Sequence, residues 1–105
     1  MNNDKIIKLP PFKIIKVFTT FSETIGWGVK QLRVPDARKI TKGDDIVILV
    51  IDTGCPKHYD VDEAIINEKC KSFVKDELDI YDFQCHSSHC CGIIGARNND
   101  KGMVG

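Results

Sequence analysis

The sequence predicts an α/β protein with a mostly parallel sheet, and the chain holds an incomplete, N-terminal portion of that sheet. The run Ile46–Ile51 is entirely aliphatic, which is typical of a strand buried on both faces of a parallel sheet. Residues 85–96 then place apolar side chains on one stripe of a helix. The order strand, loop, strand, helix is that of the first part of an α/β sheet protein. We expect no further helix or strand after residue 102. Later βα units of the sheet are therefore predicted to be missing.

The segment before the sheet predicts an extended arm and a linker. Pro10 and Pro11 do not fit a helix interior, and Ile14–Phe18 predicts one short strand. Residues 22–28 have turn character, and we expect Trp27 to anchor this linker by packing.

The remaining elements follow from local signals. Val34–Ile40 fits one or two helical turns with Pro35 near their start. The apolar strand ends in the turn Asp52–Gly54. Lys71–Val74 predicts a second short strand, and the acidic stretch 75–82 predicts a solvated loop.

The composition is that of one ordinary globular domain or part of one. The chain has 105 residues, of which 42% are hydrophobic and 29% charged. Its 15 Lys and Arg balance 15 Asp and Glu, which removes the electrostatic argument for nucleic acid or an anionic membrane as a partner. The longest apolar run has six residues, whereas a membrane span needs about 20. The N-terminus does not resemble a secretory signal, and five cysteines, an odd number, favour a reducing compartment, so we expect a cytoplasmic protein.

Two motifs carry groups that could do chemistry. Asp52 directly follows the apolar strand, where functional groups of parallel sheets gather; the alternative is an aspartate that only closes the turn. His86 opens the predicted helix and shares a face with His89. A histidine is the usual general base near neutral pH, and Asp52 could hold His86 in the tautomer that accepts a proton. The alternative is that both histidines are ordinary polar or packed residues.

The cysteines around these histidines also fit zinc, which favours Cys and His at short spacings. Cys85, Cys90 and Cys91 lie within six residues of one another, with His86 and His89 between them. Cys90 and Cys91 are adjacent, however, and adjacent side chains diverge on a helix, so a tetrahedral four-ligand site needs irregular backbone. A small zinc-binding module is kept as an alternative interpretation of this cluster.

The two motifs together resemble those of the subtilisin-like serine proteases (subtilases, peptidase family S8). Ile46–Gly54 is similar to the family's strand-plus-aspartate motif, and His86–Ile94 is similar to its His-Gly-Thr-His-Val-Ala-Gly helix. Asn98–Gly105 is similar to the family's Asn-Asn…Gly-Val-x-Gly stretch, and Trp27–Lys30 with Val34–Ala37 resembles its N-terminal segment. The resemblance implies a subtilisin-like three-layer fold, in which residues 26–105 form the N-terminal part of a peptidase domain.

The resemblance assigns Asp52 as the carboxylate that orients the histidine and His86 as the general base of an Asp-His-Ser triad. Ser87 and Ser88 stand where the family has Gly and Thr, and no Gly-Thr-Ser motif or oxyanion-hole Asn is matched. We therefore expect the N-terminal part of an endopeptidase for peptide or protein substrates, whose serine lies beyond this chain, and no triad hydrolysis by the chain alone. The alternative is a truncated or degenerate, non-catalytic relative that acts as a binding fragment.

A narrower resemblance is to the intracellular subtilisins, which commonly place a Cys after Asp-Thr-Gly, as Cys55 does here. Their N-terminal extension bears a Leu-Ile-Pro-Tyr/Phe element that lies across the active site, and Leu9, Pro10, Pro11 and Phe12 are similar to it. Residues 1–25 are therefore expected to form an N-terminal extension. The resemblance implies that it is autoinhibitory; the alternative is an arm that only packs on the domain.

Triad chemistry requires no cofactor, and the resemblance implies one structural ion, calcium. Asp60, Asn99 and the carbonyls of Lys101 and Met103 fall near the matching positions of the family. Hard cations prefer such oxygen ligands. The alternative is a solvated loop in which the Asn residues serve the turn.

Overall fold

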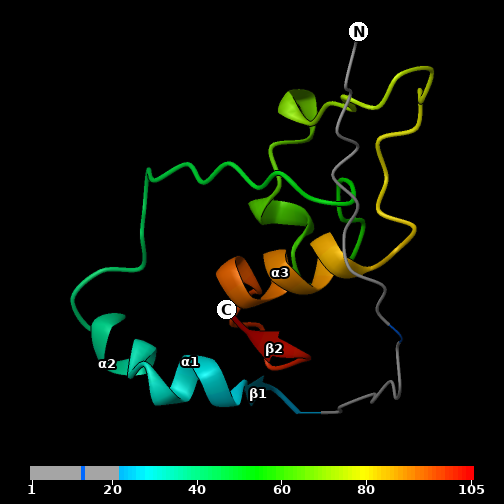
Figure 1. Ribbon diagram of the computed structural model, residues 1–105. Coiled ribbons are helices and arrows are strands. Elements are labelled where there is room, and N and C mark those ends of the chain that lie inside the picture. The colour runs from blue at the N-terminus through cyan, green and yellow to red at the C-terminus, as the bar shows by residue number, and fades with distance from the viewer. Residues whose placement is uncertain (1–12, 14–21) are drawn as a thin grey trace, which may run out of the picture.

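The computed structural model describes residue 13 and residues 22–105. Its elements in chain order are β1 (Thr24–Ile25), α1 (Trp27–Gln31), α2 (Val34–Ala37), the 3-10 helices η1 (Asp62–Ala64) and η2 (Asn67–Lys69), α3 (His86–Gly95) and β2 (Met103–Val104). Figure 1 shows α3 lying next to β2, with α1 and α2 on one side and the long loops that carry η1 and η2 on the other. None of the described helices has the length and apolar character needed to cross a membrane.

The sheet of the described residues is parallel and short. β1 pairs with β2, with Thr24 opposite Met103 and Ile25 opposite Val104. The amide of Thr24 also donates to the carbonyl of Gly102 at 2.8 Å. The described part is thus α/β with a parallel sheet. Neither β1 nor β2 was expected from the sequence, which predicts a linker at 22–28 and no element after residue 102. The three-layer arrangement stays a prediction.

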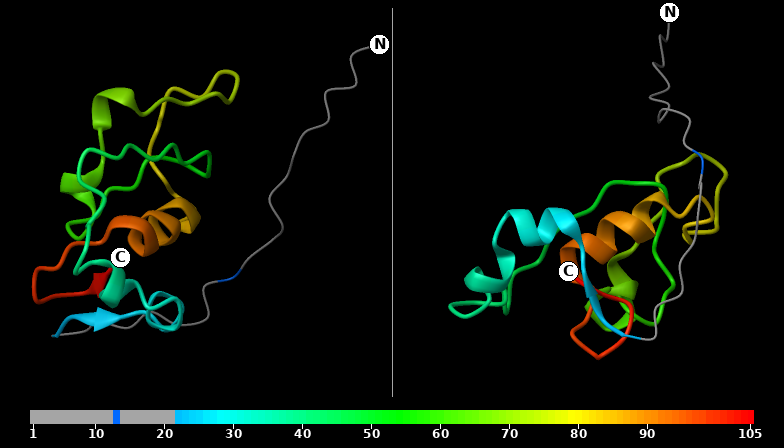
Figure 2. Two further views of the ribbon diagram at one scale, coloured as in Figure 1. Left: turned by 90° about the vertical axis from the view of Figure 1, so that its left-hand side faces the viewer. Right: turned by 90° about the horizontal axis from the view of Figure 1, so that it is seen from below.

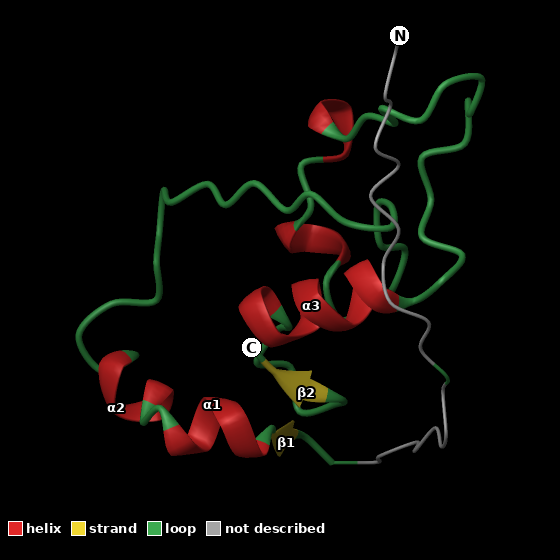
Figure 3. Ribbon diagram, in the orientation of Figure 1, coloured by secondary structure: helices red, strands yellow, loops and turns green. Residues whose placement is uncertain are grey.

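The predicted buried strand at 46–51 is wrong for the described part of the chain. The segment belongs to no strand, and Ile46, Leu49 and Ile51 are 70%, 82% and 87% exposed. A strand forms only against a neighbour that completes its hydrogen bonds, and no described segment pairs with this one. In Figure 3 it is part of the long loop that leads away from α2.

Four further local predictions can be compared with the structure. Residues 71–74 form no strand, and Phe73 is 88% exposed, with the Lys71 ammonium 5.6 Å from the centroid of its ring. Trp27 opens α1 and is 82% exposed, so it does not anchor a linker. The helix at 34–40 is confirmed as α2 with Pro35 in its first turn, and the helix at 85–96 is confirmed as α3. The predicted strand at 14–18 lies outside the described residues.

The small core gathers around α3. Cys91 of α3 is buried together with Val61, Ala96 and Val104. The chain then returns to the helix end, where the amide of Gly105 donates to the carbonyl of Ala96 at 3.0 Å. Figure 2 shows from two further directions that α3 and the last strand stay together. This packing holds α3 in place, and α3 carries His86.

Candidate active site

The turn after the aliphatic run is fixed against a second loop. The amide of Cys55 donates to the carbonyl of Ile80 at 2.6 Å, and the amide of Asp82 donates back to the carbonyl of Cys55 at 2.9 Å. Gly54 makes this approach possible, because a Cβ there would lie 2.7 Å from the carbonyl carbon of Tyr81. The position of Asp52 therefore depends on residues 80–82.

Asp82 connects this turn to the start of α3. Its Oδ1 accepts hydrogen bonds from the hydroxyl of Thr53 at 2.7 Å and the amide of Gln84 at 3.2 Å. Its Oδ2 accepts from the amide and the hydroxyl of Ser88, at 2.7 and 2.6 Å. Thr53 Oγ1 in turn accepts from the amide of Ser87 at 3.1 Å. Because N–H groups of a first helical turn lack partners within the helix, an acidic acceptor there stabilises the helix and fixes its direction.

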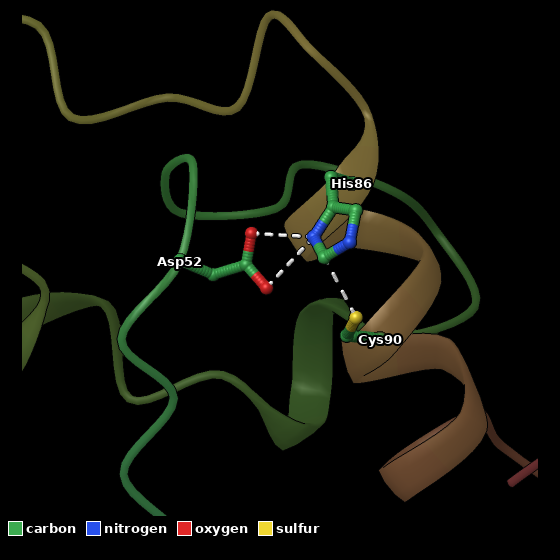
Figure 4. Close-up of side chains that lie close together, drawn as sticks. All are labelled: Asp52, His86 and Cys90. Carbon is green, nitrogen blue, oxygen red and sulfur yellow. Dashed lines mark hydrogen bonds and ion pairs between the residues drawn. The ribbon is translucent and has the colours of Figure 1, made fainter. Parts of the chain in front are cut away.

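His86 is the first residue of α3 and faces Asp52. Cys85 precedes it in a left-handed conformation with φ 63°, which turns the loop into the helix. The Nδ1 atom of His86 lies 2.7 Å from Oδ1 and 2.9 Å from Oδ2 of Asp52 (Figure 4). The Asp52 side chain is 10% exposed and that of His86 is 41% exposed. The carboxylate thus accepts the Nδ1 hydrogen, which defines the tautomer of the ring.

The pKa of Asp52 is lowered. Burial alone would raise it, but hydrogen bonds from His86 and from the Thr53 amide, which donates to Oδ1 at 2.6 Å, outweigh burial. Asp52 is therefore a carboxylate at neutral pH, as an aspartate that orients a histidine must be.

Cys90 completes the immediate surroundings of this pair. It lies one helical turn after His86, and its Sγ is 3.8 Å from His86 Nδ1 (Figure 4). Burial raises the pKa of the Cys90 thiol, and the negative charge of Asp52 raises it further. The group beside the Asp52–His86 pair is therefore a neutral thiol.

The serines that follow His86 have structural roles. Ser87 is 2% exposed, its backbone is helical and not left-handed, and its Oγ contacts Cys91 Sγ at 3.9 Å. The helix thus accommodates a side chain at a position where the resembling motif has glycine. Ser88 is engaged by Asp82, so neither serine is placed as a nucleophile.

The broad Cys/His cluster of the zinc interpretation is not assembled. Within the part of the chain that the structure describes, only one set of three Cys, His, Asp or Glu side chains has its ligand atoms together, namely Asp52, His86 and Cys90. His89 is exposed, and Cys91 is buried on another face of α3. This follows from the helix itself, because consecutive side chains point in different directions.

Asp60 and Asn99 lie together, as the calcium prediction requires, but the facing groups are hydrogen-bond donors. Asp60 is 4% exposed; its Oδ1 accepts from Asn99 Nδ2 at 3.0 Å and its Oδ2 accepts from the amide of Met103 at 3.0 Å. The Asn99 Oδ1 accepts from the amide of Lys101 at 3.1 Å. One N–H group thus donates to each carboxylate oxygen of Asp60, the oxygens that a calcium ion would need as ligands. Calcium binding stays a prediction.

The proposed inhibitory element Leu9, Pro10, Pro11 and Phe12 lies outside the described residues. Sequence reasoning missed the positioning groups Asp82 and Ser88, since the acidic stretch 75–82 predicts only a solvated loop. The signal that could have found Asp82 is an acidic residue shortly before a predicted helix.

Comparisons with known proteins agree with the motif interpretation. A family profile described as "Subtilase family" (peptidase S8) matches residues 43–105. The chain is 30% identical to an intracellular serine protease of Paenibacillus polymyxa over 97% of this chain and 32% of that protein. It is 33% identical to an alkaline protease of Alkalihalobacillus alcalophilus over 83% of this chain and 22% of that protein. It is 34% identical to the major intracellular serine protease of Bacillus subtilis (strain 168) over 74% of this chain and 26% of that protein.

The chain spans at most about a third of the length of these relatives. No solved structure matches it.

Proposed function

Because the chain belongs to the subtilase family, we propose that it is the N-terminal part of a serine endopeptidase in which Asp52 and His86 are the first two members of an Asp-His-Ser triad. The observation that carries this proposal is the contact between the Asp52 carboxylate and His86 Nδ1 at 2.7 Å, made by residues 34 positions apart. The names of the relatives, all proteases, support the same reaction class.

In this mechanism Asp52 holds the hydrogen of His86 on Nδ1, so that Nε2 is the nitrogen that takes a proton. His86 removes the hydroxyl proton of a serine as that serine attacks a peptide carbonyl, and it then returns the proton to the leaving amine. The Asp52 carboxylate stabilises the imidazolium that forms in between. The serine is supplied by a segment beyond Gly105.

The wider features of the enzyme are part of the same proposal. Its substrates are peptides or proteins, and residues 1–25 act as an inhibitory extension. Its location is the cytoplasm, which is supported by the words "intracellular serine protease" in the names of two relatives and by five unpaired cysteines among the described residues.

The test is to express the complete reading frame that contains this chain and to measure peptide hydrolysis and labelling by a serine-directed fluorophosphonate probe. We expect His86→Ala to abolish hydrolysis, and His89→Ala, an exposed residue of the same helix, to retain it. The proposal fails if the reading frame supplies no Gly-Thr-Ser segment, or if His86→Ala leaves hydrolysis unchanged.

A further inference from the structure

Cys90 has no role in the mechanism above, yet its thiol lies beside the Asp52–His86 pair. His86 and Cys90 are spaced i, i+4 on α3, which puts both side chains on one face of the helix. Asp52 approaches the same point from the turn after residue 51. The carboxylate oxygen, Nδ1 and Sγ all lie within 4.8 Å of one another.

We propose that the Asp52 carboxylate, His86 Nδ1 and Cys90 Sγ form a three-ligand site for Zn²⁺. The metal would take the place of the hydrogen that Nδ1 now donates to the carboxylate. A carboxylate, an imidazole and a thiolate are the ligand types that zinc uses in proteins.

The distances are close to those of a tetrahedral site. With Zn–N and Zn–O near 2.1 Å and Zn–S near 2.3 Å, ligand atoms lie about 3.4 to 3.6 Å apart. The present Nδ1–Sγ distance of 3.8 Å needs a change of only a few tenths of an ångström. The Nδ1–Oδ1 distance of 2.7 Å must open by roughly 0.7 Å, which side-chain rotation of Asp52 can supply.

Charge and access also fit the metal. The carboxylate and the thiolate together carry two negative charges, so bound Zn²⁺ leaves no net charge in the partly buried site. The 41% exposure of the His86 side chain gives the ion a route of entry and leaves room for a water as the fourth ligand.

Binding changes the protons of the site in a defined way. The Cys90 thiol loses its proton to solvent as the Zn–S bond forms. The imidazole stays neutral, and its hydrogen passes through solvent from Nδ1 to Nε2 as the Zn–N bond forms. An imidazole with hydrogen on Nε2 cannot accept a proton there, so zinc would block the general base. This consequence rests on the proposed function, whereas zinc binding itself does not.

The test is a Co²⁺ titration of the reduced 105-residue chain, followed by displacement with Zn²⁺. Thiolate-to-cobalt charge-transfer absorption reports whether a cysteine is a ligand. We expect Cys90→Ala to weaken binding by at least about 100-fold, because even groups that only support a metal ligand contribute about 10- to 100-fold. Asp52→Asn should also weaken binding, through a residue outside the helix.

The matched control is Cys85→Ala, which removes an exposed thiol just before α3 and should leave affinity unchanged. Far-UV circular dichroism of each variant verifies that the helices are retained. The proposal is overturned if the absorption persists in Cys90→Ala, which would place the metal elsewhere, for example at Cys55 and Cys70, whose sulfurs lie 2.9 Å apart.

A second measurement is the ¹⁵N spectrum of the His86 ring, which should change from hydrogen on Nδ1 to hydrogen on Nε2 as zinc is added. Unchanged ring nitrogens at saturating zinc would also refute the site. Because these measurements need no hydrolysis, absence of metal binding leaves the protease proposal standing, and absence of protease activity leaves the metal site standing.

Discussion

Replacing Asp82 by Asn should destabilise the protein and loosen the start of α3. The Asp82 carboxylate accepts four hydrogen bonds, from Thr53, Gln84 and twice from Ser88. Asn keeps only one acceptor oxygen. Its NH₂ group replaces the other oxygen and is itself a donor, so it cannot accept the two hydrogen bonds that this oxygen accepts in the wild-type protein. Asn and Asp side chains have nearly the same shape. A change in stability therefore reports the loss of the acceptor oxygen and not a change in packing.

The magnitude follows from the lost contacts. A hydrogen bond to a charged group contributes about 1.5 to 3 kcal/mol. Because Asp82 is partly exposed and its bonds are not additive, we expect Asp82→Asn to lower the free energy of unfolding by about 2 kcal/mol. This is a large share of the roughly 5 to 15 kcal/mol typical of a domain.

The effect should depend on pH. Burial alone would raise the pKa of Asp82, but the hydrogen bonds from Ser88, Thr53 and Gln84 lower it overall. A group whose pKa is lowered on folding stabilises fully above its unfolded pKa of about 3.9, and that stabilisation disappears as the pH falls through the folded pKa. The difference between the two proteins should therefore be constant at neutral pH and shrink below about pH 4.

Urea unfolding followed by far-UV circular dichroism is the suitable assay, since Trp27 is 82% exposed and would report little of the packing by fluorescence. Asp79→Asn is the matched control, because this exposed carboxylate accepts one hydrogen bond, from the Tyr81 amide, that Asn can also accept. Amide exchange at Ser88 should accelerate only in Asp82→Asn. A loss below about 0.5 kcal/mol with unchanged Ser88 exchange would refute the role given to Asp82.

Three other substitutions test the same region. Asp52→Asn should move the ring hydrogen of His86 from Nδ1 to Nε2, because the new amide donates a hydrogen bond where the carboxylate accepted one. ¹⁵N spectra of the ring at neutral pH measure this shift, and an unchanged spectrum would contradict the pairing of Asp52 with His86. Gly54→Ala should cost about 1 to 3 kcal/mol in urea unfolding, since its Cβ would meet the Tyr81 carbonyl at 2.7 Å; wild-type stability would contradict this close approach. Gly102→Ala should cost about 1 kcal/mol or more and speed exchange of the Met103 amide, since φ is +63° and the Cβ would lie 2.5 Å from Asp60 Oδ2; unchanged exchange would count against it.

The sequence was sufficient to predict the helices and the Asp52–His86 contact, which depend on local signals and motifs. The helices at 34–40 and 85–96 follow from a proline at the first turn and from an apolar stripe, and both are present. The approach of Asp52 to His86 followed from two motifs in order at a fitting separation. Their catalytic roles remain predictions.

Features that depend on distant partners could not be predicted. An aliphatic run such as Ile46–Ile51 indicates a strand, but whether it is buried depends on neighbours that pair with it. Strands of two residues, as in β1 and β2, are too short for a periodic pattern. The place of Asp82 shortly before a helix could mark it as a capping residue. Its contact with Thr53 could not be predicted, because Thr53 belongs to a distant segment.

The pairing of β1 with β2 has a consequence for synthesis in the cell. Thr24 leaves the ribosome 79 residues ahead of its partner Met103. At a translation rate of about 5 to 20 residues per second, β1 waits roughly 4 to 16 s before the sheet can close. Within that interval the aliphatic segment at 46–51 also leaves the ribosome, 52 residues or more ahead of Met103, so its exposed apolar side chains can be bound by chaperones before the sheet closes.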